Sequence, residues 1–239
     1  MDWLLNRPIA HRGFHYGREI PENSMQAFEA AIARHHPIEL DIQQLADGAL
    51  VVFHDSELDR LTGQSGLISE QTTSTIQNLK LFQTDQSIPL LKDVLTVIKG
   101  RVPVLIEIKN EGEIGPLESA LLTLVSTYEG EFAIQAFNPF SLEFFKRKAP
   151  HIRRGQLSGN FEGEDLSWHQ KFLLSNLMLN SKSDPDFIAY DLSALPSVAT
   201  TVNRRLFQTP LLAWTVRSDI DRLKAKACSD NFIFDAYAF

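Results

Sequence analysis

Strand-like and helix-like segments alternate along the whole chain of 239 residues. Short runs of apolar, β-branched and aromatic residues predict the strands, and apolar residues spaced three or four apart predict the helices between them. Eight of the strand-like runs start near residues 8, 38, 102, 132, 154, 187, 211 and 232. Strands that alternate with helices form parallel sheets, and eight such units suit a chain of roughly 250 residues. We therefore predict an α/β protein with the (β/α)8 TIM-barrel fold.

A doubly wound open sheet is the alternative fold for such a pattern. It is disfavoured because the first strand is followed by His11-Arg12-Gly13 and not by a glycine-rich phosphate loop. We expect a single domain over residues 1–239, since no repeat, linker or low-complexity tract interrupts the alternation. The polar segment 56–87 is too long for a simple connection, so we expect it to form a small insertion after the second strand.

Composition narrows the class of protein. The net charge of −7 argues against binding to nucleic acid, and no apolar run approaches the length of a membrane span. The single cysteine, Cys228, rules out an intramolecular disulfide and fits a reducing compartment. The first residues carry no signal-peptide pattern. We expect a cytoplasmic protein that acts on a small molecule, and the sequence leaves its oligomeric state open.

The second strand is predicted to turn back as a hairpin that gathers charged residues. Alternating polarity over Ile38–Ile42 predicts a strand, and Asp47-Gly48 is a strong signal for a two-residue turn. With those two residues as the turn, the antiparallel register places Asp41 opposite His54, and Glu39 lies on the same face as Asp41. The alternative is a surface hairpin with solvated charges. Carboxylates among apolar neighbours are better explained by pairing or by a bound metal.

Polar residues cluster at the predicted carboxyl ends of the strands, where barrels of this class carry their chemistry. They are His11, Arg12, Glu39, Asp41, Glu107, Lys109, Gln135, Asp191, Trp214, Thr215 and Asp235. Three converging carboxylates need positive charge among them, and oxygen ligands suit a hard divalent cation, Mg²⁺ or Ca²⁺. Glu39, Asp41 and Glu107 are therefore candidate metal ligands. The alternative, salt bridges to Arg12 and Lys109, is compatible with a bound metal.

Cations and histidines in the same cluster indicate phosphate chemistry. Arg12 and Lys109 are candidates for binding an anion, because a guanidinium offers a fork to phosphate oxygens and an ammonium offers a point charge. His11 and His54 could supply a general base and a general acid on either side of a phosphate. We expect the other histidines to be loop or surface residues: His15, His35, His36, His151 and His169.

Taken together, these segments resemble the glycerophosphodiester phosphodiesterase family. The matching residues are His11-Arg12-Gly13, Pro21-Glu22-Asn23-Ser24, Ala27-Phe28, Glu39-Leu40-Asp41, Asp47-Gly48, Val51 to Asp55, Arg60-Leu61-Thr62-Gly63, Ile88-Pro89-Leu90, Glu107-Ile108-Lys109 and Trp214-Thr215-Val216. The resemblance implies a TIM barrel with a small insertion after the second strand. It also implies metal bound by Glu39, Asp41 and Glu107, with His11 and His54 as the acid–base pair.

The activity implied by this resemblance is metal-dependent hydrolysis of glycerophosphodiesters to sn-glycerol 3-phosphate and an alcohol, a reaction of lipid and glycerol metabolism. Two rivals are kept: a related phospholipase D-type lyase that forms a cyclic phosphate, and a non-catalytic barrel that binds phosphorylated metabolites. The choice between Mg²⁺ and Ca²⁺, the alcohol and the nucleophile stay open. So does the assignment of acid and base to the two histidines.

Four further residues are candidates for contacts in the site. Trp214 is expected to form an apolar wall for the glycerol moiety, with core packing as the alternative. Glu22, Asn23 and Gln135 are expected to support the catalytic and ligand groups. Asn23 is also predicted to cap the helix that starts at Ser24.

Overall fold

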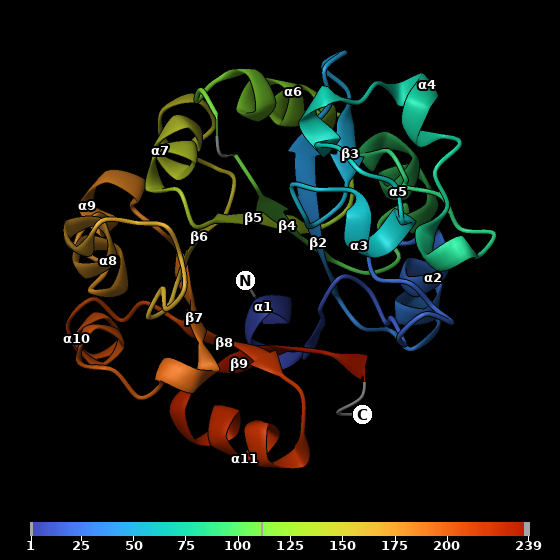
Figure 1. Cartoon of the computed structure of the whole chain (residues 1–239). Coiled ribbons are helices and arrows are strands. Elements are labelled where there is room, and N and C mark those ends of the chain that lie inside the picture. Colours follow the sequence, from blue (N-terminus) through green and yellow to red (C-terminus); the bar gives the residue numbers. More distant parts are fainter. Residues whose placement is uncertain (1, 111, 237–239) are drawn as a thin grey trace. The chain divides into compact units, whose positions relative to one another are not determined.

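The computed structural model describes residues 2–110 and 112–236. Strands alternate with helices along these residues, and the fold is the predicted (β/α)8 TIM barrel (Figure 1). The chain divides into two compact units, residues 10–132 and residues 1–9 with 133–239. A single domain over the whole chain stays a prediction. Among the described residues, none of the helices has the length and apolarity that crossing a membrane requires.

The unit of residues 10–132 carries the first half of the strand–helix pattern. Its strands are the second residue of β1 (Ile9–Ala10), β2 (Ile38–Gln44), β3 (Leu50–Val52) and β4 (Val104–Ile108), and its main helices are α2 (Met25–Ala33), α5 (Leu91–Ile98) and α6 (Pro116–Val125). β2 pairs in parallel with both β1 and β4. α2 packs against α5 outside these strands. The predicted strand starts near residues 8, 38 and 102 lie within two residues of the observed ones.

The predicted hairpin of β2 and β3 forms, but the predicted register was wrong by one residue. The N–H of Phe53 donates to the carbonyl of Asp41 at 3.0 Å, so Asp41 lies opposite Phe53 and not opposite His54. The cause is a turn of three residues, 46–48, in place of two. Its last residue, Gly48, has a φ of 83°, as expected for the left-handed position that ends a three-residue hairpin loop.

Segment 56–87 is a small insertion after the second strand, as predicted. It contains α3 (Asp59–Thr62), η1 (Ile68–Glu70), α4 (Thr73–Ile76) and η2 (Leu81–Gln83). The short helices α3 and α4 lie beside the hairpin in Figure 1. Their buried residues form a separate apolar cluster, which Phe53 at the end of the hairpin joins. The chain that follows β3 is therefore anchored by the insertion.

The unit of residues 1–9 and 133–239 continues the alternation. Its strands are β5 (Phe132–Ala136), β6 (Arg154–Ser158), β7 (Phe187–Asp191), β8 (Leu211–Val216) and β9 (Asn231–Phe234), each paired in parallel with the next. Its helices are α1 (Asp2–Asn6), α7 (Pro139–Lys148), α8 (Trp168–Ser175), α9 (Asn180–Ser183), α10 (Val198–Leu206) and α11 (Asp219–Cys228), and η3 (Leu192–Ala194) is a short 3₁₀ turn. The side chain of Asn231 donates to the carbonyl of Leu4 at 2.7 Å, which fixes α1 against β9.

Candidate active site

Three carboxylates meet where β2 pairs in parallel with β4. Glu39 and Asp41 share one face of β2, and the parallel register places Glu107 of β4 beside Asp41. One oxygen from each of the three lies within 4.8 Å of the others, and all three residues are buried. The structure thus brings together the three residues that the sequence nominated as metal ligands.

These carboxylates carry more negative charge than their surroundings neutralise. Burial, together with repulsion from Asp41 and Glu107, raises the pKa of Glu39 well above its ordinary value. Burial also raises the pKa of Glu107, although the charge of Lys109 opposes it. Among the described residues, Glu39 Oε1 and Asp41 Oδ1 are buried with no hydrogen-bond partner. An all-oxygen donor set with orphaned oxygens and unbalanced charge fits a hard divalent cation.

Arg12 follows β1 and contacts two of these carboxylates. Its backbone N–H donates to Glu39 Oε2 at 2.9 Å, and its Nε lies 3.3 Å from Asp41 Oδ2. Its Nη1 donates to Glu22 Oε1 at 2.6 Å. Burial alone would lower the pKa of the Arg12 guanidinium. The negative charges of Asp41 and Glu22 outweigh burial and raise the pKa of Arg12 above its ordinary value. Arg12 is thus a fixed, fully charged cation at the edge of the cluster.

The backbone around Arg12 needs unusual conformations. Arg12 and Asn23 have φ values of 52° and 53°, which are rare for residues other than glycine. Gly13, with a φ of 80°, passes so close to Ala27 that a Cβ would lie 2.9 Å from its carbonyl carbon. Such strain collects at functional sites, where the surrounding structure holds it in place. The glycine is required here by both its φ and its close contact.

Asn23 donates a hydrogen bond to Asp41 and does not cap a helix, and its supporting role stays a prediction. Its Nδ2 donates to Asp41 Oδ2 at 2.8 Å, as a supporting residue would. The prediction of Asn23 as the cap was wrong, because Ser24 occupies that position and accepts from the N–H of Ala27. With the Asn23 side chain committed to Asp41, the hydroxyl of the next residue satisfies the helix N-terminus.

The other predicted cation lies beside the same carboxylates, and both histidines lie within electrostatic range of Asp41. Lys109 Nζ is 3.4 Å from Glu107 Oε1. Burial would raise the pKa of Asp41, but the charge of Arg12 and the charges of His54, Lys109 and His11 together hold it well below its ordinary value. Both histidines are therefore close enough to Asp41 to act on its charge.

His54 reaches the site although the predicted register failed. β3 ends at Val52, so the following residues leave the ladder and the strict alternation of strand faces no longer applies. The Nδ1 of His54 lies 2.7 Å from Asp55 Oδ1. Three residues that contact this segment were not predicted as site residues: Asp55, Arg60 and Gln43. The sequence signals that could have indicated Asp55 and Arg60 are the His54-Asp55 dipeptide and the segment Arg60-Leu61-Thr62-Gly63.

The sequence profile of the "Glycerophosphoryl diester phosphodiesterase family" matches residues 11–236. The chain belongs to this family. A curated member, the glycerophosphodiester phosphodiesterase of Caldanaerobacter subterraneus subsp. tengcongensis, is 31% identical over 242 residues, covering 95% of this chain and 93% of that protein. The uncharacterized protein YqiK of Bacillus subtilis is 34% identical over 171 residues, covering 65% of this chain and 68% of the relative. The chain is therefore an enzyme of the phosphoric diester hydrolase class.

Solved structures of related proteins share the fold. An Oleispira antarctica phosphodiesterase in complex with the product sn-glycerol-3-phosphate superposes with a TM-score of 0.81 at 23% identity, covering 98% of this chain and 94% of that one. A putative glycerophosphodiester phosphodiesterase from Galdieria sulphuraria also gives 0.81, at 18% identity, covering 97% of this chain and 94% of that one. At these identities the comparison establishes the TIM-barrel fold that this family member adopts.

Two predicted site residues belong to the other unit, and their roles stay predictions. Gln135 of β5 is buried, and its Oε1 has no hydrogen-bond partner among the described residues. Trp214 of β8 is half-buried and packs edge-on against Phe137, with ring centroids 5.6 Å apart.

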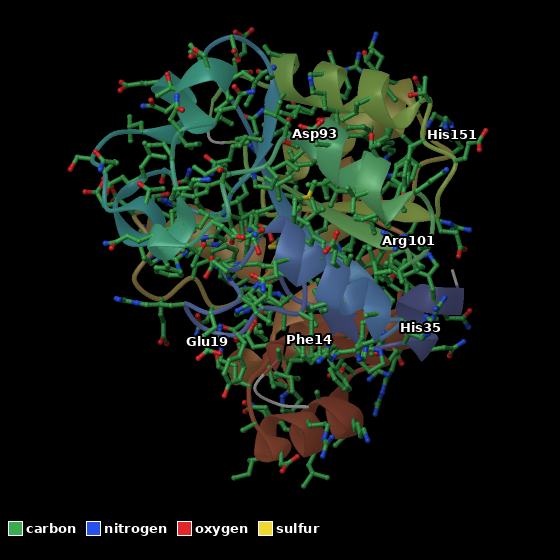
Figure 2. All side chains as sticks on the ribbon, turned by 90° about the vertical axis from the view of Figure 1, so that its right-hand side faces the viewer. Phe14, Glu19, His35, Asp93, Arg101 and His151 are labelled. Atoms are coloured by element: carbon green, nitrogen blue, oxygen red, sulfur yellow. The ribbon has the colours of Figure 1, made fainter. Side chains whose placement is uncertain are left out.

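The remaining histidines lie mostly where they were expected. His35 and His151 project from the surface in Figure 2, and His169 is also exposed. His15 is in the loop after β1, but it is buried.

Proposed function

We propose that this family member is a metal-dependent phosphodiesterase that hydrolyses glycerophosphodiesters to sn-glycerol 3-phosphate and an alcohol. The observation that carries the proposal is the buried cluster of Glu39, Asp41 and Glu107, with orphaned carboxylate oxygens and two flanking cations. The curated relative from Caldanaerobacter subterraneus carries the name of this activity, and the Oleispira antarctica structure contains sn-glycerol-3-phosphate. Both support a small-molecule substrate of this class.

Glu39, Asp41 and Glu107 would hold one divalent cation, Mg²⁺ or Ca²⁺. When bound, such an ion acts as a Lewis acid toward a phosphate oxygen and as a template for the substrate. The fit rests on the oxygen donor set, on its burial and on the raised pKa values of Glu39 and Glu107. Protonated carboxyls would bind metal poorly, so the ion and the ionised state of the cluster support each other.

Arg12 and Lys109 would bind the phosphate. Arg12 is held by Glu39, Asp41 and Glu22, so little of its side-chain entropy is left to lose when it binds an anion. Lys109 is mostly buried beside Glu107 and provides a second positive charge. Both charges are in place before the reaction, as electrostatic stabilisation of the transition state requires.

His11 and His54 would exchange the two protons of the reaction. One histidine takes a proton from the nucleophile as its oxygen bonds to phosphorus, and the other gives a proton to the alkoxide as the bond between phosphorus and the alcohol oxygen breaks. Asp55 accepts from His54 Nδ1 in this scheme, which leaves Nε2 for proton transfer. The nucleophile is water or a glycerol hydroxyl of the substrate, and the second choice gives a cyclic phosphate first.

Two rival functions were kept from the sequence. The phosphodiesterase names of the family and of the curated relatives favour hydrolysis over a lyase that stops at the cyclic phosphate. The complete set of candidate ligands and histidines argues against a non-catalytic barrel. A cytoplasmic location stays a prediction that rests on the single cysteine.

Product analysis tests the proposal. The protein is incubated with glycerophosphocholine or glycerophosphoethanolamine after chelation, and again with added Mg²⁺ or Ca²⁺. We expect sn-glycerol 3-phosphate and the free alcohol only when a metal is present, and roughly 10²-fold less product or lower from a His11→Ala preparation made in parallel. A stable cyclic phosphate as the final product would favour the lyase. Absence of any turnover under all metal conditions would contradict the proposed activity.

A further inference from the structure

One arginine of the insertion binds two carboxylates at once. Arg60 of α3 donates from Nε to Asp55 Oδ2 at 2.6 Å and from Nη2 to Asp55 Oδ1 at 3.0 Å. It also donates from Nη1 to Glu22 Oε2 at 2.9 Å and from Nη2 to Glu22 Oε1 at 2.7 Å. Each carboxylate is thus held in a two-point contact by the same planar guanidinium. Such contacts fix orientation as well as distance.

Each of these two carboxylates also contacts a residue of the candidate site. Asp55 Oδ1 lies 2.7 Å from His54 Nδ1, and Glu22 Oε1 accepts from Arg12 Nη1 at 2.6 Å. The guanidinium of Arg60 therefore stands between the proposed proton-transfer histidine and the proposed phosphate-binding arginine. Glu22 and Arg60 are 38 positions apart in sequence, so the link exists only in the folded chain.

The carboxyl groups of Glu22 and Asp55 stay ionised at neutral pH. Burial would raise the pKa of Glu22, but hydrogen bonds from Arg60 and the charges of Arg12 and Arg60 lower it to about 2. Burial likewise opposes ionisation of Asp55, and its contacts with His54 and Arg60 hold its pKa well below the ordinary value. The Arg60 side chain is 45% exposed, and ion pairs of such exposed side chains contribute little to folding stability, so stability alone does not account for its double contact.

We propose that Arg60 is a positioning residue that sets His54 and Arg12 in register with each other, through Asp55 and Glu22. The inference rests on the proposed function, since that function gives His54 and Arg12 their roles. The insertion thereby does more than pack against the hairpin. It orients the imidazole for proton transfer and restrains the guanidinium that would bind the phosphate.

The chain offers a closely matched control for removal of Arg60. Arg153 pairs with Asp186 in the other unit, and the side chains are 49% and 25% exposed, against 45% and 23% for Arg60 and Asp55. We expect Arg60→Ala to lower kcat by about tenfold to a hundredfold, the range for misplaced reacting groups, and to raise KM. Arg153→Ala should leave both constants unchanged. Free guanidinium ion should restore part of the activity of Arg60→Ala.

A second readout does not depend on turnover. Nitrogen NMR of the His54 imidazole at neutral pH reports which ring nitrogen carries the proton. We expect one tautomer, protonated at Nδ1, in the wild type and in Arg153→Ala, and a mixture of tautomers in Arg60→Ala. Arg60→Lys keeps the charge without the fork, so it should recover less of kcat than of thermal stability.

The two readouts separate failure of this inference from failure of the proposed function. An unchanged His54 tautomer in Arg60→Ala would overturn the positioning role, and so would kinetic constants equal to those of Arg153→Ala. A wild type without activity on any glycerophosphodiester would defeat the proposed function, and the tautomer would still test Arg60.

Discussion

The side-chain amide of Gln43 lies 3.2 Å from the backbone carbonyl of His54. The same nitrogen also donates to the carbonyls of Phe53 at 2.9 Å and Asp55 at 2.8 Å. Gln43 therefore holds the segment that carries His54 at the point where it leaves the β-ladder. We expect this contact, and not the register of the hairpin, to fix the position of His54.

Replacement of Gln43 by leucine tests this contact. Gln43→Leu removes the donor to three carbonyls, so we expect the His54 segment to shift and kcat to fall by about tenfold. Gln44→Leu is the control, because in the described part of the chain that neighbouring amide donates to the carbonyl of Gly48 in the turn. Turnover and melting temperature are measured for both variants. Equal kcat values would show that Gln43 does not position His54.

Removal of either proposed proton-transfer group should impair chemistry more than binding. We expect His11→Ala and His54→Ala each to lower kcat by roughly 10²-fold or more, the usual loss for a general acid or base. KM should change less, because Arg12 and Lys109 remain. Steady-state kinetics on glycerophosphocholine provide the measurement. A variant that keeps near-normal kcat would identify its histidine as structural.

Replacement of Trp214 distinguishes a role as a wall for the substrate from a role in core packing. Its contact with Phe137 is edge-on, and the ring is only half-buried. Trp214→Phe keeps an aromatic ring but shortens the reach of the side chain. If Trp214 forms a wall for glycerol, KM rises and the melting temperature stays the same. A loss of melting temperature with unchanged KM would assign the residue to the core.

The lowered pKa of Glu22 predicts that part of the folding free energy is lost at acidic pH. Its pKa falls from an ordinary 4.5 to about 2 in the folded chain, so its contribution is present above pH 4.5 and is lost as the pH falls toward 2. The shift sets an upper limit of about 3 kcal/mol. Denaturant unfolding at several pH values should show Glu22→Gln less stable than wild type at pH 6 and equally stable near pH 2. A constant difference would contradict the assignment.

The fold was predictable because its signals are local. Apolar runs predicted most of the eight barrel strands, while β6 (Arg154–Ser158) had only a weak strand pattern, and the length and polarity of segment 56–87 predicted the insertion. Helix α1 was missed because a distant residue, Asn231, fixes it through the carbonyl of Leu4. The hairpin register was missed because Asp47-Gly48 announces a turn but not whether the loop has two residues or three.

The carboxylate cluster was predictable from the same logic, since residues at strand ends of a barrel converge. The supporting contacts were not. Arg60 reaches Glu22 across 38 positions, and Gln43 acts on backbone carbonyls that carry no sequence signal. Such contacts depend on the path of a loop, which propensity and periodicity do not define.

In the proposed mechanism, Glu39, Asp41 and Glu107 hold the cation that hydrolysis needs. The most direct measurement is a titration of the chelated protein with Mg²⁺ or Ca²⁺, in which bound metal and hydrolysis of glycerophosphocholine are followed together. We expect activity to rise from zero in step with one bound ion, and Glu107→Gln to shift both curves to higher metal concentration. Full activity in the metal-free protein, or metal binding unaffected by Glu107→Gln, would contradict it.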